Sequence, residues 1–378
     1  MTEFKCGTML AQKPQTLRAK MPMTDSDTLP TLSRRAFGRC ALFTVVSTIS
    51  FLHLPLGLGQ ESQLDFSTRM FRLGEEFKEK LGDRWSAVNP KANIFIPKEL
   101  EKSFVPALGK IVWELPRDVA KHVSFSARIY EISDGRHVGY VRVPHYDYDE
   151  DTIREFSKVI GNFENSTAAL VFDQVNNPGG SMIHMYAMLS FLTDRSLSVP
   201  KHQFTLSDED ASMASDIVQR AEAGDDTVSR ENLAYSRFVL SEIAAGRKRL
   251  TNPGFLAGVK EVVPENVHYT KKIIVLNNER TFSAGEFLAA ILQDNKRATL
   301  FGQRTPGAGG CAKRFEIPGG KDLGIESITI TWTIGWRTSG QPIENLGVHP
   351  DVSYPITVED LRSGYSGYRK ALLEAIDF

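Results

Sequence analysis

The alternation of short apolar strands with helices from residue 136 onward is the feature that most limits the fold. Strands are predicted at 138–143, 168–173, 272–276 and 298–302. Helices are predicted between them at 149–163, 183–192 and 283–293. Strands that alternate with helices in this way form a parallel sheet with helices on both faces. The sequence therefore predicts an α/β core over residues 136–378.

Other segments are predicted to decorate this core. Residues 207–250 are polar with helical spacing, which indicates a helical insertion. Alternating Ile and Thr over 325–336 predict a strand, and 358–378 has the spacing of an amphipathic helix. Residues 60–135 form a short N-terminal region of mixed helix and strand.

Residues 1–59 have the pattern of an export leader. The pair Arg34-Arg35 and Phe37 precede an apolar run from Ala41 to Leu52, as in a twin-arginine signal. Gly57 and Gly59 provide the small residues expected before a cleavage site after Gly59. The run is too short for a comfortable membrane span. We therefore expect an exported protein without a stable span after leader removal, the alternative being an uncleaved anchor.

Composition excludes several classes of protein. The chain has 45 Lys and Arg against 46 Asp and Glu, so a strong electrostatic grip on nucleic acid is not expected. Leader removal would take Cys6 and Cys40 and leave Cys311 alone, without a partner for an intramolecular disulfide. No Cys/His pair has zinc-ligand spacing, and no metal or cofactor is predicted.

The first candidate for chemistry is Ser283, where a buried strand gives way to a helix. One interpretation is a capping box, in which Ser283 caps the helix and Glu286 reaches back from the third helical position. The other is a nucleophile, whose hydroxyl is exposed at the turn and whose developing charge is stabilised by the helix N-terminus. In that case the amide of Ala284 is free to face an oxyanion.

The second candidate is the segment Asn176-Asn177-Pro178-Gly179-Gly180, which follows another buried strand. It reads either as a Gly-rich turn or as a loop whose paired glycines let a substrate carbonyl approach backbone N–H groups. Both loops leave the carboxyl ends of parallel strands, where ligands bind in α/β sheets. We therefore expect Gly179 and Gly180 to lie beside Ser283.

Three motifs in sequence order carry a resemblance to a known family. They are Asp173 to Gly180, Phe282 to Gly302 and Ile343 to Asp351. This arrangement resembles the core of the tail-specific (C-terminal-processing) serine proteases, most closely the branch of the chlamydial protease-like activity factor and tricorn protease. The resemblance covers roughly residues 136–355 and implies a crotonase-like ββα protease core.

The resemblance assigns roles position by position. It implies that Ser283 is the nucleophile and that Glu344 is the acidic partner of the branch that uses Ser, His and Glu. It also places Gly179, Gly180 and Ala284 in the oxyanion hole. Many relatives use a lysine base in a stretch that here reads Thr305 to Gly309, with Ala308 at the lysine position, so a Ser–Lys mechanism is not expected.

The histidine of the Ser-His-Glu branch usually comes from an N-terminal domain for which this chain lacks room. The base must then come from elsewhere or be missing. His145 is the first candidate because it follows the strand 138–143 at the same sheet edge as Ser283. The alternative for His145 is a loop histidine that merely packs or meets solvent. His184 and His122 are the second and third candidates.

Three functional hypotheses remain open from the sequence. The first is an exported serine-type endopeptidase acting on peptide or protein substrates through an acyl-enzyme. The second is a catalytically inactive homologue that binds peptides or other ligands. The third is a half-enzyme completed by a partner or a second copy, so an oligomer is not excluded. Fold resemblance alone does not decide among them.

Overall fold

The computed structural model describes residues 66–81, 103–317 and 327–377. The leader predicted over 1–59, with Cys6 and Cys40, lies outside the described residues. The helices are α1 (Phe66–Leu81), α2 (Arg117–Ala120), α3 (Glu150–Ser166), α4 (Met182–Leu189), α5 (Asp208–Glu222), α6 (Arg230–Ala244), α7 (Ala284–Asp294), α8 (Val358–Arg362) and α9 (Ser366–Ile376). The strands are β1 (Lys110–Glu114), β2 (Ser126–Glu131), β3 (His137–Arg142), β4 (Ala169–Asp173), β5 (Leu197–Ser198), β6 (Lys201–Phe204), β7 (Glu261–Val262), β8 (Lys272–Asn277), β9 (Thr299–Gly302), β10 (Ala312–Glu316), β11 (Ser327–Thr331), β12 (Thr333–Trp336) and β13 (Val352–Ser353).

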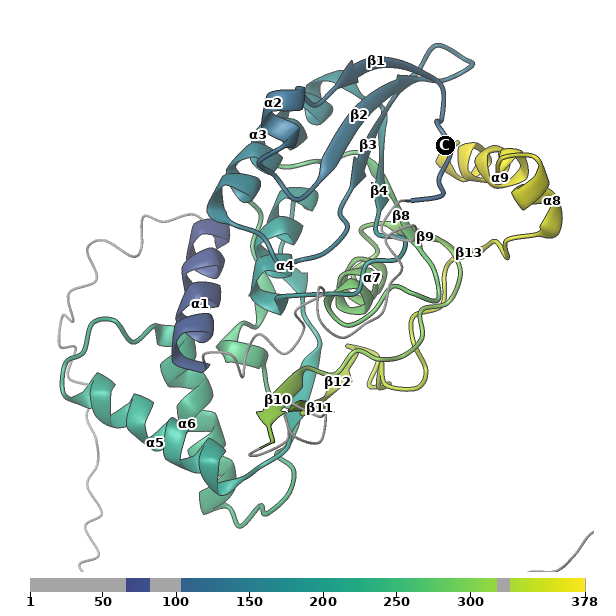
Figure 1. Ribbon diagram of the computed structural model, residues 1–378. Helices are drawn as coiled ribbons and strands as arrows, with labels where there is room; N and C mark the ends of the chain where they lie inside the picture. Colours follow the sequence, from purple (N-terminus) through teal and green to yellow (C-terminus); the bar gives the residue numbers. More distant parts are fainter. Residues whose placement is uncertain (1–65, 82–102, 318–326, 378) are drawn as a thin grey trace, which may run out of the picture. The chain divides into compact units, whose positions relative to one another are not determined.

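A seven-stranded mixed sheet organises the chain, in the order β1-β2-β3-β4-β8-β9-β13 (Figure 1). Within this sheet, β3, β4, β8, β9 and β13 run parallel, as the alternating pattern predicts. The strands β1, β2 and β3 form an antiparallel meander. The register pairs Arg142 with Asp173 and Asp173 with Leu276. The ends of β3, β4 and β8 are therefore level, and the loops that follow them share one edge of the sheet.

Both faces of the sheet are covered, which confirms the predicted α/β architecture. One face packs against α3, α4 and α7, whose apolar residues join a single buried cluster. The other face packs against α9 through Tyr368, Leu372 and Ile376. The helix α3 buries Ile153, Phe156, Val159, Ile160 and Phe163, the stripe that its helical spacing predicts.

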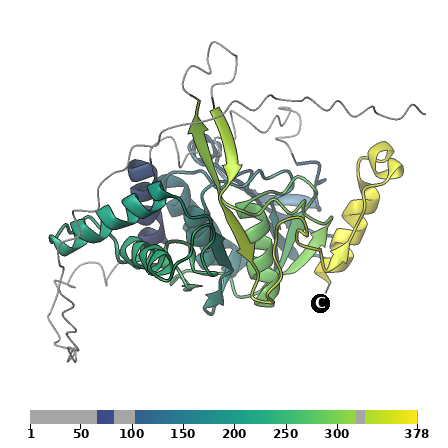
Figure 2. The same cartoon turned by 90° about the horizontal axis from the view of Figure 1, so that it is seen from below.

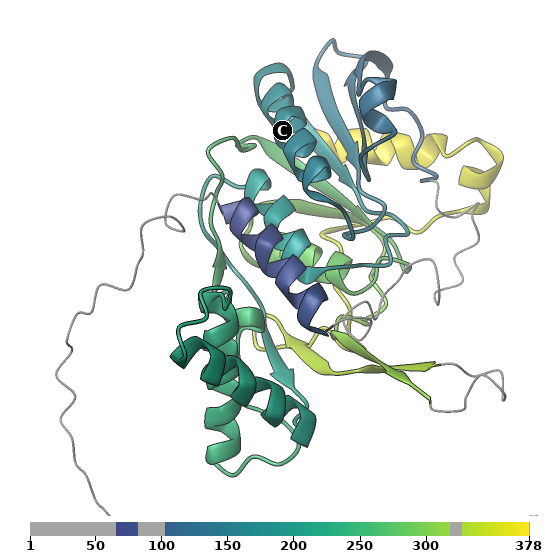
Figure 3. The same ribbon diagram turned by 60° about the vertical axis from the view of Figure 1, so that its left-hand side comes forward.

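The region 207–250 holds α5 and α6, which pack against each other (Figure 3). Each helix begins at a serine that caps it: Ser207 accepts from the Asp210 amide, and Ser229 accepts from the Asn232 amide. The helix α1 lies along α4 in the same view.

The C-terminal part differs from the sequence prediction in two places. The strand predicted over 325–336 is broken at Trp332, which is buried and packs on Phe204 with ring centroids 5.3 Å apart. As a result β11 pairs with β10 in a ribbon that projects from the sheet (Figure 2), whereas β12 pairs with β6. The helix predicted over 358–378 is two helices, because Gly364 and Tyr365 both have φ of +64°.

A buried carboxylate, Asp173, stabilises the edge where β3, β4 and β8 end. It accepts hydrogen bonds from the Tyr140 hydroxyl at 2.5 Å and the Val175 amide at 2.8 Å, and it pairs with Arg142 at 3.3 Å. Arg142 also donates to the Val175 carbonyl. This cluster fixes the start of the loop that contains Gly179.

We predict that Asp173→Ala lowers the free energy of unfolding by about 3–5 kcal/mol, because it leaves the buried Arg142 charge uncompensated. The control is Asp134→Ala, which removes an exposed ion pair with Arg136 and should cost at most ~1 kcal/mol. Urea unfolding monitored by fluorescence measures both. Equal small losses for the two variants would contradict a structural role for the Asp173 cluster.

Candidate active site

Ser283 sits in a strained turn between β8 and α7. Its φ and ψ of 49° and −120° are rare for a residue with a side chain. Its amide donates to the Ala308 carbonyl at 3.2 Å, and its side chain makes no capping bond to α7. The capping-box interpretation is therefore wrong for Ser283, although it describes Ser207 correctly. The Ser283 hydroxyl is therefore not used to cap α7.

The Gly179-Gly180 loop touches Ser283. A Cβ atom placed on Gly179 would lie 2.6 Å from Cβ of Ser283 and 3.1 Å from the amide nitrogen of Ala284. The φ angles of Gly179 and Gly180 are +99° and +133°, a region that side chains disfavour. Glycine is thus required at 179 on two grounds, conformation and space. The prediction that the two loops meet at one sheet edge is confirmed.

The amides at this contact differ in availability. The Gly179 amide donates to Asn177 Oδ1 at 2.7 Å, so it is already used within its own loop. The amides of Gly180 and Ala284 have no acceptor among the described residues. Ala284 opens the helix α7, whose N-terminus carries a partial positive charge. The pair that can hold an anion is therefore Gly180 and Ala284, with Gly179 providing the space.

Side-chain amides hold the loops together. Gln174 accepts from the Tyr146 hydroxyl at 2.6 Å and donates to Asn277 Oδ1 at 2.6 Å and to the Gly285 carbonyl at 2.9 Å. One side chain thus links the loop after β3, the end of β8 and the first turn of α7. Sequence reasoning missed this residue, although an amide directly after a buried strand was the available signal.

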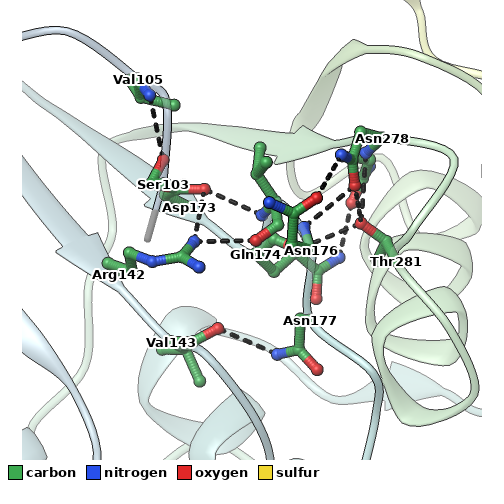
Figure 4. A network of polar contacts seen from close by, with 12 residues as sticks. Ser103, Val105, Arg142, Val143, Asp173, Gln174, Asn176, Asn177, Asn278 and Thr281 are labelled. Carbon is green, nitrogen blue, oxygen red and sulfur yellow. Dashed lines mark hydrogen bonds and ion pairs between the residues drawn. The ribbon is translucent and has the colours of Figure 1, made fainter. Parts of the chain in front are cut away.

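A second set of amides fixes the glycine loop itself. The side-chain amide of Asn177 donates to the Val143 carbonyl at 2.9 Å, and the backbone carbonyl of Asn177 accepts from the Phe282 amide at 2.9 Å. Figure 4 shows Asn177 reaching Val143, and Asn176 facing Asn278, whose side-chain amide donates to Asn176 Oδ1 at 2.7 Å. The loop therefore has fixed partners in the segments that follow both neighbouring strands, β3 and β8.

Glu344 lies on a loop that contacts the same region. Its Oε2 accepts from the Gly335 amide at 2.9 Å, whereas Oε1 is buried and has no hydrogen-bond partner among the described residues. Burial raises the pKa of this carboxyl above its usual value. The next residue, Asn345, donates to the Gly307 carbonyl at 2.8 Å, in the loop that reaches Ser283 through Ala308. A buried carboxylate oxygen without a donor is costly, which makes Glu344 a candidate functional residue.

The candidate histidines occupy different environments. His145 is half-buried and accepts from the Asp147 amide at 3.2 Å, and the amide of its neighbour Tyr146 donates to the Gly179 carbonyl at 2.8 Å. His145 thus belongs to the loop that packs against the glycine loop. His184 is fully buried between Phe71 and Tyr148, in the core. His122 follows α2 and is exposed.

A fourth histidine, His202, lies next to the one cysteine in the described part of the chain. Its Nδ1 is 4.0 Å from the Cys311 sulfur and 3.1 Å from Thr333 Oγ1, and its ring stacks on Phe287. Burial lowers the pKa of His202 to about 3 and raises the pKa of Cys311 to about 12. Both groups are neutral near pH 7, so Cys311 has no thiolate character.

Within residues 66–81, 103–317 and 327–377, no group of three or more His, Cys, Asp or Glu residues could hold a metal ion. None of the helices in these ranges has the length and apolar character needed to cross a bilayer.

Comparisons with known proteins identify the family of the chain. Residues 137–354, more than half of the 378-residue chain, match the sequence model of peptidase family S41. A protein of Chlamydia trachomatis serovar D is 35% identical over 299 residues, which cover 70% of this chain and 48% of that protein. A carboxy-terminal-processing protease of Bartonella bacilliformis is 33% identical over 105 residues, which cover 28% of this chain and 22% of that protease.

Among solved structures, mature CPAF superposes with a TM-score of 0.65 and 33% sequence identity, over 77% of this chain and 61% of that chain. Mature CPAF complexed with lactacystin gives a TM-score of 0.64 at 32% identity, over 77% of this chain and 62% of that chain. The chain spans about half the length of its Chlamydia trachomatis relative.

The contact at Gly179 generates a stability prediction. We expect Gly179→Ala to lower the free energy of unfolding by roughly 2–5 kcal/mol, from backbone strain and from overlap with Ser283. The control Gly135→Ala also has positive φ but meets no atom within 4 Å, so about 1–2 kcal/mol is expected. Thermal or urea unfolding measures the difference. The contact would be refuted by equal losses.

The unpartnered Oε1 of Glu344 generates a pH prediction. Because the pKa of this carboxyl is raised on folding, its contribution to stability is present at acid pH and is lost as pH rises through the folded pKa. Glutamine at 344 does not titrate. The melting temperature of Glu344→Gln should therefore rise relative to that of the wild type as the pH is raised from acid to neutral. Melting curves at several pH values measure this, with exposed Glu222→Gln as the control for removing one surface charge. A melting temperature of Glu344→Gln that falls relative to that of the wild type between acid and neutral pH would contradict the burial of Glu344.

Proposed function

The chain belongs to peptidase family S41, and from this premise we propose that it is an exported serine-type peptidase that cleaves peptide bonds through an acyl-enzyme on Ser283. The Ser283 oxygen attacks the peptide carbonyl carbon, and its proton passes to a histidine. The histidine then returns the proton to the leaving amine. Water, activated by the same base, releases the acyl group from Ser283.

One observation carries this proposal: Ser283, whose side chain does not cap its helix, touches the Gly179-Gly180 loop, and the amides of Gly180 and Ala284 have no acceptor among the described residues. A tetrahedral intermediate on Ser283 places negative charge on the former carbonyl oxygen. The amides of Gly180 and Ala284 are fixed before the reaction by the amide side chains around them, so they need no reorganisation. The N-terminus of α7 adds its dipole at the same point.

We assign the base to His145 and its orientation to Glu344. His145 is in the loop that hydrogen-bonds to the Gly179 carbonyl through Tyr146, which brings it to the sheet edge of Ser283. A lysine base is excluded at the family position, because Ala308 stands there with its carbonyl against the Ser283 amide. The carboxylate of Glu344 has an oxygen available to accept from an imidazole.

Two observations favour the alternative, an inactive homologue that binds peptides. Oε1 of Glu344 has no imidazole as partner among the described residues, and Ala308 replaces the lysine of many relatives. A half-enzyme completed by a partner or a second copy is a variant of the first proposal. The substrates proposed are peptides or proteins, because a relative is named as a carboxy-terminal-processing protease.

A fluorophosphonate probe tests the nucleophile. We predict covalent labelling of the wild type at Ser283, located by peptide mass mapping, and no labelling of Ser283→Ala. The matched control is Ser229→Ala, a serine that caps α6 in the ordinary way, which should label as the wild type does. Folded wild type that fails to label, yet binds peptides as tightly as Ser283→Ala, would establish the inactive homologue instead.

The same probe tests the base. His145→Ala should slow labelling by about 10²–10⁴-fold, the usual contribution of a general base. The comparison variant is His122→Ala, an exposed histidine that should leave the rate unchanged. A slow His122→Ala together with a fast His145→Ala would transfer the role to His122. A labelling rate per protein molecule that increases with protein concentration would favour completion by a second copy.

A further inference from the structure

Glu286 is a fully buried carboxylate that the proposed mechanism does not use. It is the third residue of α7, and its side chain is turned away from solvent. It accepts hydrogen bonds from the Thr305 hydroxyl, the Gly307 amide and the Ala308 amide, each at 2.7 Å. No described cation forms an ion pair with it. Its three hydrogen bonds of 2.7 Å therefore all come from neutral donors of one loop.

The loop that Glu286 holds is the one that contacts the candidate nucleophile. The carbonyl of Ala308 accepts from the Ser283 amide at 3.2 Å, and the Ser283 amide also lowers the pKa of Glu286, so it lies near the carboxylate. On its other side, the Gly307 carbonyl accepts from the Asn345 amide, next to Glu344. One carboxylate thus anchors a loop that contacts Ser283 at one end and the Glu344 loop at the other.

This arrangement is costly for the fold. Burial raises the pKa of Glu286, and the three donors offset only part of that cost. A buried carboxylate is weak evidence for a purely stabilising role, since apolar replacements of buried charges are often neutral for stability. The strained φ of Ser283 also has to be held by its surroundings. Both costs are explained if the hydrogen bonds serve to fix the nucleophile.

We propose that Glu286 is a positioning residue of the site, which clamps the 305–308 loop so that Ser283 keeps the backbone conformation that presents its hydroxyl beside the Gly180 and Ala284 amides. This inference rests on the proposed function. It adds to the capping-box interpretation of Glu286: besides lying near the Ser283 amide, the carboxylate binds a loop 19–22 residues along the chain.

The test compares Glu286→Gln and Glu286→Ala with Asp360→Asn. Glutamine keeps one acceptor oxygen but places an NH₂ group against an amide donor, so the clamp is weakened without a cavity. Asp360, on α8, is a matched control because it is also a buried carboxylate with several hydrogen bonds. It accepts from the Thr357 hydroxyl, the Thr357 amide and the Tyr368 amide.

The first readout is fluorophosphonate labelling, measured over a range of probe concentrations well below the melting temperature. The maximal rate of labelling should fall about 10-fold or more in Glu286→Gln, while the concentration for half-maximal rate stays constant, because only the orientation of Ser283 changes. Asp360→Asn should lose stability without losing rate. An unchanged rate in Glu286→Gln, or an equal loss in Asp360→Asn, overturns the proposal.

The second readout does not depend on catalysis. Hydrogen exchange of the Gly307 and Ala308 amides should accelerate at least 10-fold in Glu286→Ala and stay constant in Asp360→Asn, since each amide loses its acceptor only in the first variant. Protected amides in Glu286→Ala overturn the clamp. Wild type that does not label, combined with accelerated exchange, refutes the peptidase proposal and keeps the clamp.

Discussion

The contact between Gly179 and Ser283 is the constraint on which the rest of the site depends. It exists because β4 and β8 are adjacent parallel strands in level register, so that the loops following them emerge at the same point. Only glycine has both the φ and the space for this contact. Once it is made, the glycine loop lies against the start of α7, where the Ala284 amide and the helix dipole stabilise negative charge.

The polar groups around this contact have a shared role. Gln174 and Asn177 join neighbouring segments at the sheet edge, and Glu286 joins α7 to the 305–308 loop, with hydrogen bonds of 2.6–2.9 Å. Loops are the most mobile parts of a fold, so a site built on loops needs such cross-links to keep its geometry. Burying these amides and a carboxylate is tolerable because they are nearly all satisfied. Nδ2 of Asn277 and Oε1 of Glu344 are exceptions among the described residues, and Glu344 is at the position that the family resemblance assigns to the acidic partner.

The sequence predicts the parallel sheet well because apolar strands and amphipathic helices follow their periodicities closely, as α3 does with its stripe of five apolar residues. It predicts the meeting of Gly179 with Ser283 because strand direction alone decides which loops share an edge. It fails where tertiary contacts override local pattern. Trp332 breaks a regular Ile/Thr strand by packing into the core, and Ser283 with Glu286 reads as a capping box although Glu286 binds Thr305, Gly307 and Ala308.

The most direct test of the central claim is a crystal structure of the protein with a peptide boronate or phosphonate bound covalently. The account predicts a tetrahedral adduct on the Ser283 oxygen, with one adduct oxygen within about 2.7–3.1 Å of both the Gly180 and the Ala284 nitrogen atoms. An adduct whose oxygen points to solvent, or which forms on a residue other than Ser283, would contradict the account.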